Sequence, residues 1–533
     1  FRGCLKTLLN TREKKRFQEV AQSIVVDLDR PIAPKGIAVF LDCGFKRDGA
    51  MYALIMRSLT EKGWHVASLH DDLEMHAVED KTLSLLDASL KRVSSTEYVV
   101  KEDIRRDLKA IEWEIDLASG TCLADGIDYY PIVMGKLRRL HKAYDLDFTD
   151  DEISLSAEEV LKSAAAALAI CYFLRDKVAS TDLPVRIIGA EHLYVPTGMF
   201  MMFCAEEGYR HGVEFIDFGG AYSHYFTAGE YLEFQVYAVQ NITRRNTISR
   251  HIIDRSTFDQ WVNKGQDVDG ALKEAQAVIQ QNWIGTDERP DEARRLVEKI
   301  KHHRANGGAV ACAFGHVGFD LSVPRDHGDA HKNMVDWLND TITTLNDTDT
   351  LLLIKPHPSE KRYKPNRKPT QLLEELIHVP RAQNVIMLDA LWFNAFDIFE
   401  LIDVGLIWRS NVALELAILG IPAVVAGKEA AYRYALDLIY PSDRDNYHDL
   451  LEDIENLQMP EQQDQRCALY LKYITTETFI NFAYVIPPEL QESQGFRYAP
   501  SSLRWNRKNL ERFLSNGDPA VDRVCTEIMS TPS

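Results

Sequence analysis

Two histidines in the second half of the chain stand directly after predicted strands, where an imidazole could contact a ligand. His316 lies between glycines in the stretch GHVG, and glycine lets a ligand approach the backbone. His357 lies between prolines in KPHP, which stiffen the chain and fix the direction of the ring. An imidazole held in this way suits a phosphate oxygen, and Lys355 adds positive charge beside it. A solvated His316 in a Gly-rich turn and a structural His357 are the alternatives.

A third polar group, Arg409, Ser410 and Asn411, follows the predicted strand GLIW. Ser410 is predicted to be the N-cap of the next helix. The unpaired N–H groups at that helix end, reinforced by Arg409, would attract an anion. Glu415 lies about a turn into the helix, where its carboxylate could accept hydrogen bonds from the vicinal hydroxyls of a ribose. A capped helix with a solvated Glu415 is the alternative.

Parallel strands covered by helices are predicted to position these groups, because ligands of doubly wound sheets bind beyond the carboxyl ends of the strands. Apolar runs alternate with amphipathic helices twice along the chain, which predicts an α/β fold with two Rossmann-like domains. The expected segments are an N-terminal helical segment (1–31), a Rossmann-like domain with a helical insertion (32–241), a connecting helical region (242–305), a second Rossmann-like domain (306–456) and a helical tail (457–533).

The composition is that of a large folded protein. The chain has 533 residues, of which 45% are hydrophobic and 26% charged, so one compact core and a disordered chain are both excluded. A formal charge of −19 argues against nucleic acid as a partner. The eight cysteines form no CxxC pair, which indicates neither a zinc ribbon nor a disulfide framework and favours a reducing cytoplasm.

Membrane contact is expected to be peripheral at most. No apolar run approaches the roughly 20 residues that a membrane-spanning helix needs. The basic start of the chain resembles a helix rather than a signal peptide and could touch the inner face of the cytoplasmic membrane as a local contact. Phe1 is not a natural start, so we expect the chain to be cut from a longer one.

The order of the motifs resembles the donor lobe of GT-B glycosyltransferases. A strand ending in KPHP precedes a strand that leads into RSNVALELAILGIPAVVAG, which is similar to the bacterial capsule polysaccharide biosynthesis proteins, a group with Kdo transferases and polysialyltransferase-like enzymes. The similarity covers about residues 309–441, roughly a quarter of the chain. Where this chain has Ser410-Asn411, many relatives have two small hydroxyl residues. The resemblance implies a GT-B fold, with two domains facing across a cleft.

The resemblance also implies a function. It indicates an inverting, metal-independent glycosyltransferase without a cofactor, which moves a sugar from a nucleotide-sugar donor to a growing bacterial surface polysaccharide or glycolipid. The expected donor-binding residues are His316, Lys355, His357, Arg409, Ser410, Asn411 and Glu415. A sugar-nucleotide epimerase of the same fold, and a non-catalytic nucleotide-sugar-binding subunit of a capsule assembly complex, are the alternatives.

A GT-B enzyme binds its acceptor in the N-terminal lobe, which should present a base on a loop after a strand. Asp48, after the predicted strand IAVFLD, is the leading candidate to take the proton from an acceptor hydroxyl. Glu191 and His192, after VRIIGA, are rivals, followed by Asp217 after VEFI. For each of them, a loop cap or a surface ion pair is the alternative.

Other signals are weaker. His327 and His331 have the spacing of two metal ligands, but no convincing third ligand is near them in sequence, and we predict no metal site. Residues 125–130, which carry two aspartates and two tyrosines, could contact an acceptor sugar or form an ordinary turn. Residues from about 79 to 177 are predicted to be mostly helical.

Overall fold

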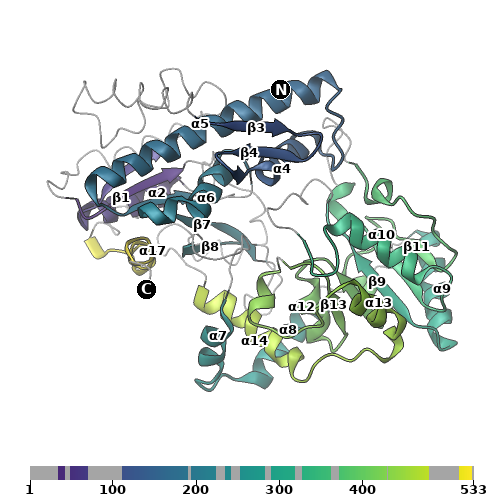
Figure 1. Ribbon diagram of the computed structural model, residues 1–533. Helices are drawn as coiled ribbons and strands as arrows, with labels where there is room; N and C mark the ends of the chain where they lie inside the picture. Colours follow the sequence, from purple (N-terminus) through teal and green to yellow (C-terminus); the bar gives the residue numbers. More distant parts are fainter. Residues whose placement is uncertain are drawn as a thin grey trace, which may run out of the picture.

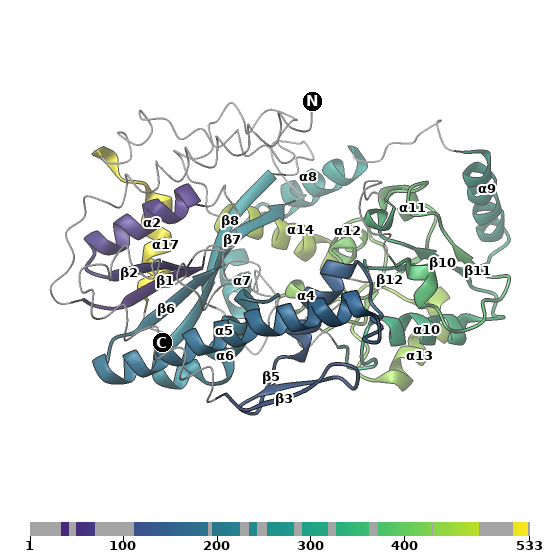
Figure 2. The same ribbon diagram turned by 90° about the horizontal axis from the view of Figure 1, so that it is seen from above.

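The computed structural model describes residues 34–41, 49–69, 111–189, 194–223, 234–241, 253–281, 290–317, 327–361, 371–428, 430–478 and 515–530. These residues form two lobes, each built on a five-stranded sheet that is covered by helices (Figures 1 and 2). The α/β class with two Rossmann-like units, as expected from the sequence, is confirmed. The division of the chain at the residue numbers given above stays a prediction.

The first lobe contains a mixed sheet. Its order is β2-β1-β6-β7-β8, and the strands are β1 (Ile37–Leu41), β2 (His65–Leu69), β6 (Val185–Gly189), β7 (Val213–Ser223) and β8 (Phe234–Asn241). The first four strands are parallel, whereas β8 runs antiparallel to β7. Every residue of β6 is buried, as expected for a strand with helices on both faces. The covering helices include α2 (Gly49–Glu61), α5 (Asp151–Thr181) and α6 (Thr197–Glu206).

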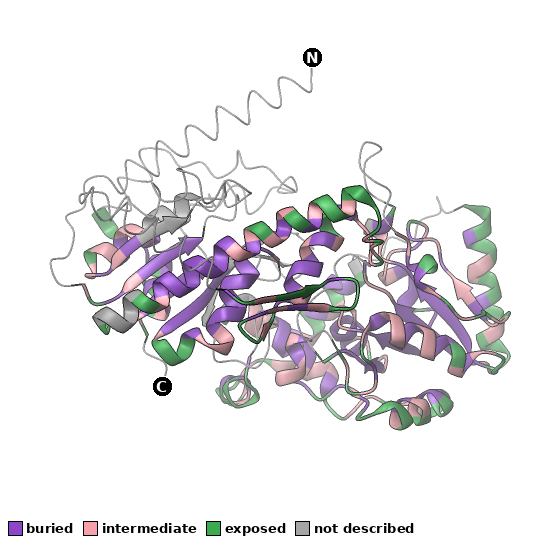
Figure 3. Ribbon diagram, turned by 45° about the horizontal axis from the view of Figure 1, so that its top comes forward, coloured by how far each residue is buried: buried purple, intermediate pink, exposed green. Residues whose placement is uncertain are grey.

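The second lobe contains an all-parallel sheet of order β11-β10-β9-β12-β13. The strands are β9 (Val310–Phe314), β10 (Leu351–Lys355), β11 (Val385–Met387), β12 (Val404–Ile407) and β13 (Ala423–Val425). Along β9, Cys312 belongs to the core on one face and its neighbours Ala311 and Ala313 to the core on the other. This alternation follows from the two-residue period of a strand, and Figure 3 shows both sheets buried.

Helices cover both faces of the second sheet. One face carries α10 (Met334–Leu345) and α13 (Arg444–Glu452), where the buried Trp337 donates from Nε1 to the Tyr447 hydroxyl at 2.8 Å. The core on the other face includes residues of α7 (Arg255–Val262), α8 (Val268–Gln281), α12 (Val412–Ile418) and α14 (Gln463–Tyr473). The predicted connecting region is therefore helical in its described parts, and α7, α8 and α9 (Asp291–Ala305) all contribute residues to the core of the second lobe.

The C-terminal segment contacts both lobes. Helix α14 packs in the second lobe, whereas α17 (Pro519–Met529) lies beside α2 of the first lobe (Figure 1). Lys62 pairs with Asp522 of α17 at 3.0 Å, and Cys525 Sγ donates to the carbonyl of Ile55 at 3.8 Å. The tail thus ties the end of the chain back to the first sheet.

Residues 111–177, the described part of the stretch predicted to be mostly helical, contain two helices and a small antiparallel sheet that was not predicted. Strands β3 (Trp113–Asp116), β4 (Thr121–Ala124) and β5 (Ile127–Asp128) precede α4 (Tyr130–His141). Asp125 and Gly126 both have positive φ, 48° and 80°, and form the two-residue connection between β4 and β5. Asp-Gly is favoured at such a hairpin turn, and contact of this stretch with an acceptor sugar stays a prediction.

No helix in the described part of the chain is long and apolar enough to cross a membrane.

Candidate functional site at one edge of the second sheet

The structure brings His316, His357 and Arg409 to one edge of the second sheet. Lys355 of β10, Phe314 of β9 and Ile407 of β12 are aligned across three neighbouring strands, and each of the three side chains follows its strand end by two residues. Because parallel strands lie about 4.8 Å apart, this register places the three at one level. The juxtaposition predicted from the sequence is present, and its role in binding stays a prediction.

The two imidazoles lie parallel. Their ring centroids are 6.3 Å apart, with an angle of 6° between the planes. The His316 backbone N–H donates to Sδ of Met334 at 3.4 Å, and the buried Nε2 has no hydrogen-bond partner in the part of the chain that the structure describes. Burial, followed by the charges of Arg409 and His357, lowers the pKa of His316 well below its ordinary value. His316 is therefore neutral at physiological pH and offers one ring N–H and one acceptor.

Gly315 packs closely against the side chain of Leu373. A Cβ at this position would lie 2.3 Å from Cδ2 of Leu373, and the backbone N–H of Gly315 donates to the carbonyl of Lys355 at 3.0 Å. The glycine therefore lets the segment at Leu373 approach the strand ends. Close approach of a ligand to the backbone at Gly315 stays a prediction.

Lys355 supports the turn that carries His357. Its buried ammonium donates to the carbonyls of Pro356 at 2.8 Å and Ala390 at 3.2 Å. These contacts fix the exit of β10 against the loop after β11. Ligand binding by Lys355 stays a prediction, and the contacts present show a positioning role for it.

The turn after β12 differs by one residue from the expectation. The N-cap of α12 is Asn411 rather than Ser410, although Ser410 Oγ still accepts from the backbone N–H of Val412 at 3.3 Å. Asn411 is exposed, and its side chain caps no N–H group. Helix α12 has only seven residues, so its dipole is weaker than that of a long helix. Any attraction for an anion must come mainly from Arg409.

Glu415 is buried rather than solvated. It lies on α12 and is only 4% exposed, and burial raises its pKa to about 8. Its carboxyl group is therefore protonated at neutral pH in the free protein. A protonated carboxyl can both donate and accept a hydrogen bond, which suits a hydroxyl group.

Glu360 is a buried acid that the motif analysis missed. Its backbone N–H donates to the carbonyl of His357 at 3.0 Å, and its Oε2 accepts from the backbone N–H of Leu373 at 3.2 Å. It thereby joins the turn of His357 to the segment that packs on Gly315. Burial raises its pKa to about 7, against the opposing effect of the Leu373 N–H and of Lys355. The only sequence signal was an acid shortly after KPHP.

Glu360→Gln is expected to raise the thermal midpoint by a few degrees at about pH 8 and to change it little at about pH 5. A carboxyl whose pKa is raised by folding contributes fully to the free energy of unfolding below its pKa in the unfolded chain, 4.5. That contribution is lost as the pH rises through its pKa in the folded protein, about 7. Glutamine keeps the acceptor for Leu373 and cannot ionise. Glu455→Gln is the control, because Glu455 is an exposed carboxyl of the same lobe. Equal effects of both substitutions would contradict the assignment.

The structure leaves the candidate bases open. Asp48, Glu191 and His192 lie outside the described residues. Asp217 was expected on a loop, but it lies inside β7, opposite Gly189 of β6, and is buried. Strand β7 continues to Ser223, beyond the point where the apolar run in the sequence ends.

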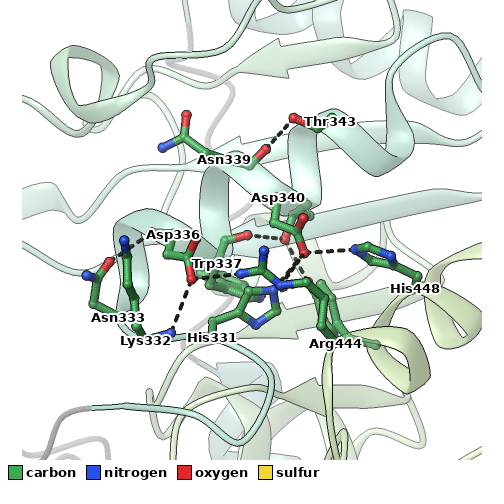
Figure 4. Close-up of polar contacts among 12 residues, drawn as sticks. His331, Lys332, Asn333, Asp336, Trp337, Asn339, Asp340, Thr343, Arg444 and His448 are labelled. Atoms are coloured by element: carbon green, nitrogen blue, oxygen red, sulfur yellow. Dashed lines mark hydrogen bonds and ion pairs between the residues drawn. The ribbon is translucent and has the colours of Figure 1, made fainter.

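His331 belongs to a polar cluster between α10 and α13 (Figure 4). Its Nε2 lies 2.8 Å from Asp340 Oδ2, and Nε2 of His448 lies 2.9 Å from the same oxygen. Arg444 pairs with Asp336 at 2.8 Å and lies 3.8 Å from Asp340. Among the residues described, no group of three His, Cys, Asp or Glu is placed to hold a metal ion. The cluster instead links two helices on one face of the sheet.

Asp340→Asn is expected to lower the free energy of unfolding by about 1–2 kcal/mol at pH 7. Burial alone would raise the pKa of Asp340, but the hydrogen bonds from His331 and His448 outweigh it and hold the pKa below its ordinary value. The stabilisation is present above about pH 4 and is lost as the pH falls further, so the deficit of the variant should shrink there. Denaturant titrations at several pH values, with the exposed Asp349→Asn as control, measure it. A deficit independent of pH would contradict the account.

Comparisons with known proteins give only distant likenesses. No protein-family model matches the chain, and no curated protein matches it. Among solved structures, Thermosulfurimonas dismutans KpsC, a beta Kdo 2,4 transferase, is 13% identical over 54% of this chain and 79% of its own, with a TM-score of 0.28. The Methanocaldococcus jannaschii UDP-GlcNAc 2-epimerase, in complex with UDP-GlcNAc and UDP, is 8% identical over 83% of this chain and 99% of its own, with a TM-score of 0.26. Likenesses of this size carry no argument about substrate or site.

Proposed function

We propose that the chain binds a nucleotide sugar at the carboxyl edge of the second sheet and transfers the sugar to an acceptor with inversion. The observation that carries the proposal is the convergence of His316, His357 and Arg409 on three neighbouring strand ends. Ligands of parallel α/β sheets bind at this edge. A cationic guanidinium beside two imidazoles matches the needs of a phosphate, which accepts hydrogen bonds and carries negative charge.

Each group has a role in the proposed reaction. Arg409 stabilises the charge that develops on the nucleotide phosphate as the bond from the anomeric carbon to the phosphate oxygen breaks. His357 and the neutral His316 donate hydrogen bonds to phosphate oxygens. Glu415 binds the ribose hydroxyls, while Ser410 and Asn411 line the same turn. Lys355 and Glu360 hold the His357 turn through the backbone contacts described above.

The first lobe supplies the acceptor side of the proposed reaction. A base removes the proton from an acceptor hydroxyl as its oxygen attacks the anomeric carbon, and the nucleotide leaves with the electron pair of the broken bond. Asp48 is the leading candidate, with Glu191 and His192 as rivals. The acceptor is a growing bacterial surface polysaccharide or a glycolipid, and the reaction takes place in the cytoplasm.

Donor conversion with and without acceptor tests this function. The purified chain is incubated with CMP-, UDP-, GDP- and dTDP-linked sugars, alone and with capsule or lipopolysaccharide fragments, and nucleotide release and sugar configuration are measured. A transferase releases nucleotide in quantity only when an acceptor is added. Conversion of the sugar without acceptor would replace the proposal by an epimerase. Binding without any turnover would replace it by a nucleotide-sugar-binding subunit.

A further inference from the structure

The row of basic side chains continues to a fourth strand. Strand β13 is the neighbour of β12 in the sheet, and Lys428 follows its end by three residues. Across β10, β9, β12 and β13, the carboxyl edge therefore presents His357, His316, Arg409 and Lys428 in turn. The first three form the candidate site, and the exit of β13 lies next to it on the side of Arg409.

Lys428 shares one counter-ion with Arg433. Lys428 Nζ lies 2.8 Å from Asp329 Oδ1, and Arg433 Nη2 lies 2.5 Å from Asp329 Oδ2. Asp329 is held against the exit of β13 because Gly328 pairs with Gly427. The Lys428 N–H also donates to the carbonyl of His327 at 2.9 Å.

Among the described residues, the charges in this group do not balance. Lys428 and Arg433 both pair with Asp329, so the three side chains together carry one positive charge. The buried Nη1 of Arg433 has no hydrogen-bond partner among the residues that are described, and its guanidinium lies over the ring of Tyr440, 4.6 Å from the centroid. Lys428 is 47% and Asp329 25% exposed at the side chain, so water and solutes reach the pair. Partly exposed ion pairs are weak, and another anion can therefore replace Asp329 at low cost.

Two hydrogen bonds connect this group to the turn of Arg409. The Gly427 N–H donates to the carbonyl of Trp408 at 2.7 Å, and the Tyr432 hydroxyl donates to the carbonyl of Ser410 at 3.0 Å. They hold the residues on both sides of Arg409. Lys428 and Arg433 are therefore fixed relative to the first anion position rather than carried on an independent loop.

We propose that Lys428 and Arg433 form a second phosphate subsite, which Asp329 occupies when no ligand is bound. This inference rests on the proposed nucleotide site. One phosphate lies at Arg409 and the histidines, and the second displaces Asp329 and binds between Lys428 and Arg433. Two cationic positions on adjacent strands fit a pyrophosphate group better than a single phosphate. The ligand class is therefore a nucleoside diphosphate sugar.

Isothermal titration of the whole chain with inorganic pyrophosphate and with the mono- and diphosphates of uridine, cytidine, guanosine and thymidine tests the subsite. We expect one diphosphate to bind at least tenfold more tightly than its monophosphate. Lys428→Gln and Arg433→Gln should remove that preference and weaken pyrophosphate binding, with little change for the monophosphate. Asp329→Asn should strengthen binding of the diphosphate and pyrophosphate several-fold. Loss of the Asp329 charge should thus strengthen binding, whereas loss of either cation weakens it. A merely structural ion pair would not give effects of opposite sign.

Arg304→Gln is the matched control. Arg304 pairs with Asp403 at 2.6 Å, next to the amino end of β12, so its loss removes the same charge at the opposite edge of the sheet. An equal loss in this variant, or weaker diphosphate binding in Asp329→Asn, would overturn the subsite. If nucleotides bind but diphosphates are not preferred, the subsite is overturned and the proposed function is not. If no nucleotide binds, but pyrophosphate binds and its affinity changes in the variants as expected, the proposed function is overturned and the subsite is not. If no probe binds, both are overturned.

Discussion

Glu415→Gln is expected to stabilise the free protein at alkaline pH. A carboxyl whose pKa is raised from 4.5 to about 8 contributes stability below about pH 4.5 and loses that contribution as the pH rises through about 8. Above that pH, the ionised group costs up to roughly 4–5 kcal/mol. Glutamine cannot ionise, so the difference in the free energy of unfolding should be near zero at about pH 5 and largest at about pH 9. Denaturant titration at both pH values measures it.

A control substitution and a binding measurement test the role of Glu415 further. Glu461 is exposed in the same lobe, and Glu461→Gln should show no such pH dependence. We expect Glu415→Ala, which cannot form a hydrogen bond, to weaken nucleotide binding about tenfold. A buried acid whose charge destabilises the free protein, but whose side chain is needed to bind the ligand, is typical of a binding residue. An unchanged stability profile for Glu415→Gln would contradict the burial of an ionisable group there.

Arg409→Ala is expected to weaken binding of the preferred nucleotide about 100-fold. Arg409 supplies the cationic partner of the first phosphate, and a hydrogen bond to a charged group is worth about 1.5–3 kcal/mol. Arg409→Lys should recover only part of the loss, because an ammonium cannot form a bidentate contact. Isothermal titration at constant ionic strength measures the three affinities.

An independent readout checks the position of Arg409. Its charge contributes to the lowered pKa of His316, so this pKa should rise in Arg409→Ala, although burial keeps it below its ordinary value. Histidine resonances in an NMR titration report the change. Arg381→Ala, which breaks the surface pair with Glu374 at 2.6 Å, is the control and should alter neither the affinity nor the histidine. An unchanged affinity in Arg409→Ala would remove the cationic centre of the proposed site.

The strand ends could be predicted from the sequence because each strand is an apolar run that stops abruptly. The prolines at 356 and 358 end β10, and the buried strands of a parallel sheet read as continuous apolar runs. Once the strands are known to be parallel, their carboxyl ends must share one edge. The juxtaposition of His316, His357 and Arg409 follows from that rule without any knowledge of contacts.

The sequence could not show what depends on contacts between distant residues. Glu360 is buried because the segment at Leu373 folds over it, and no local pattern encodes that contact. Asp329 meets Lys428 and Arg433 only because Gly328 pairs with Gly427. In contrast, the Asp-Gly turn at residues 125–126 was a readable hairpin signal, but the short strands around it gave too little alternation to outweigh the helical neighbours.

A thermal-shift series with CMP, UDP, GDP, dTDP and CDP, on the wild type and on His357→Ala, tests the central claim most directly: that the carboxyl edge of the second sheet is a nucleotide site. A ligand that binds only the folded state stabilises it by about 2.7 kcal/mol at 100 times its dissociation constant. We expect selective stabilisation by one nucleotide and a clear loss of that shift in His357→Ala. No shift with any nucleotide, or a shift that survives the substitution unchanged, would contradict the claim.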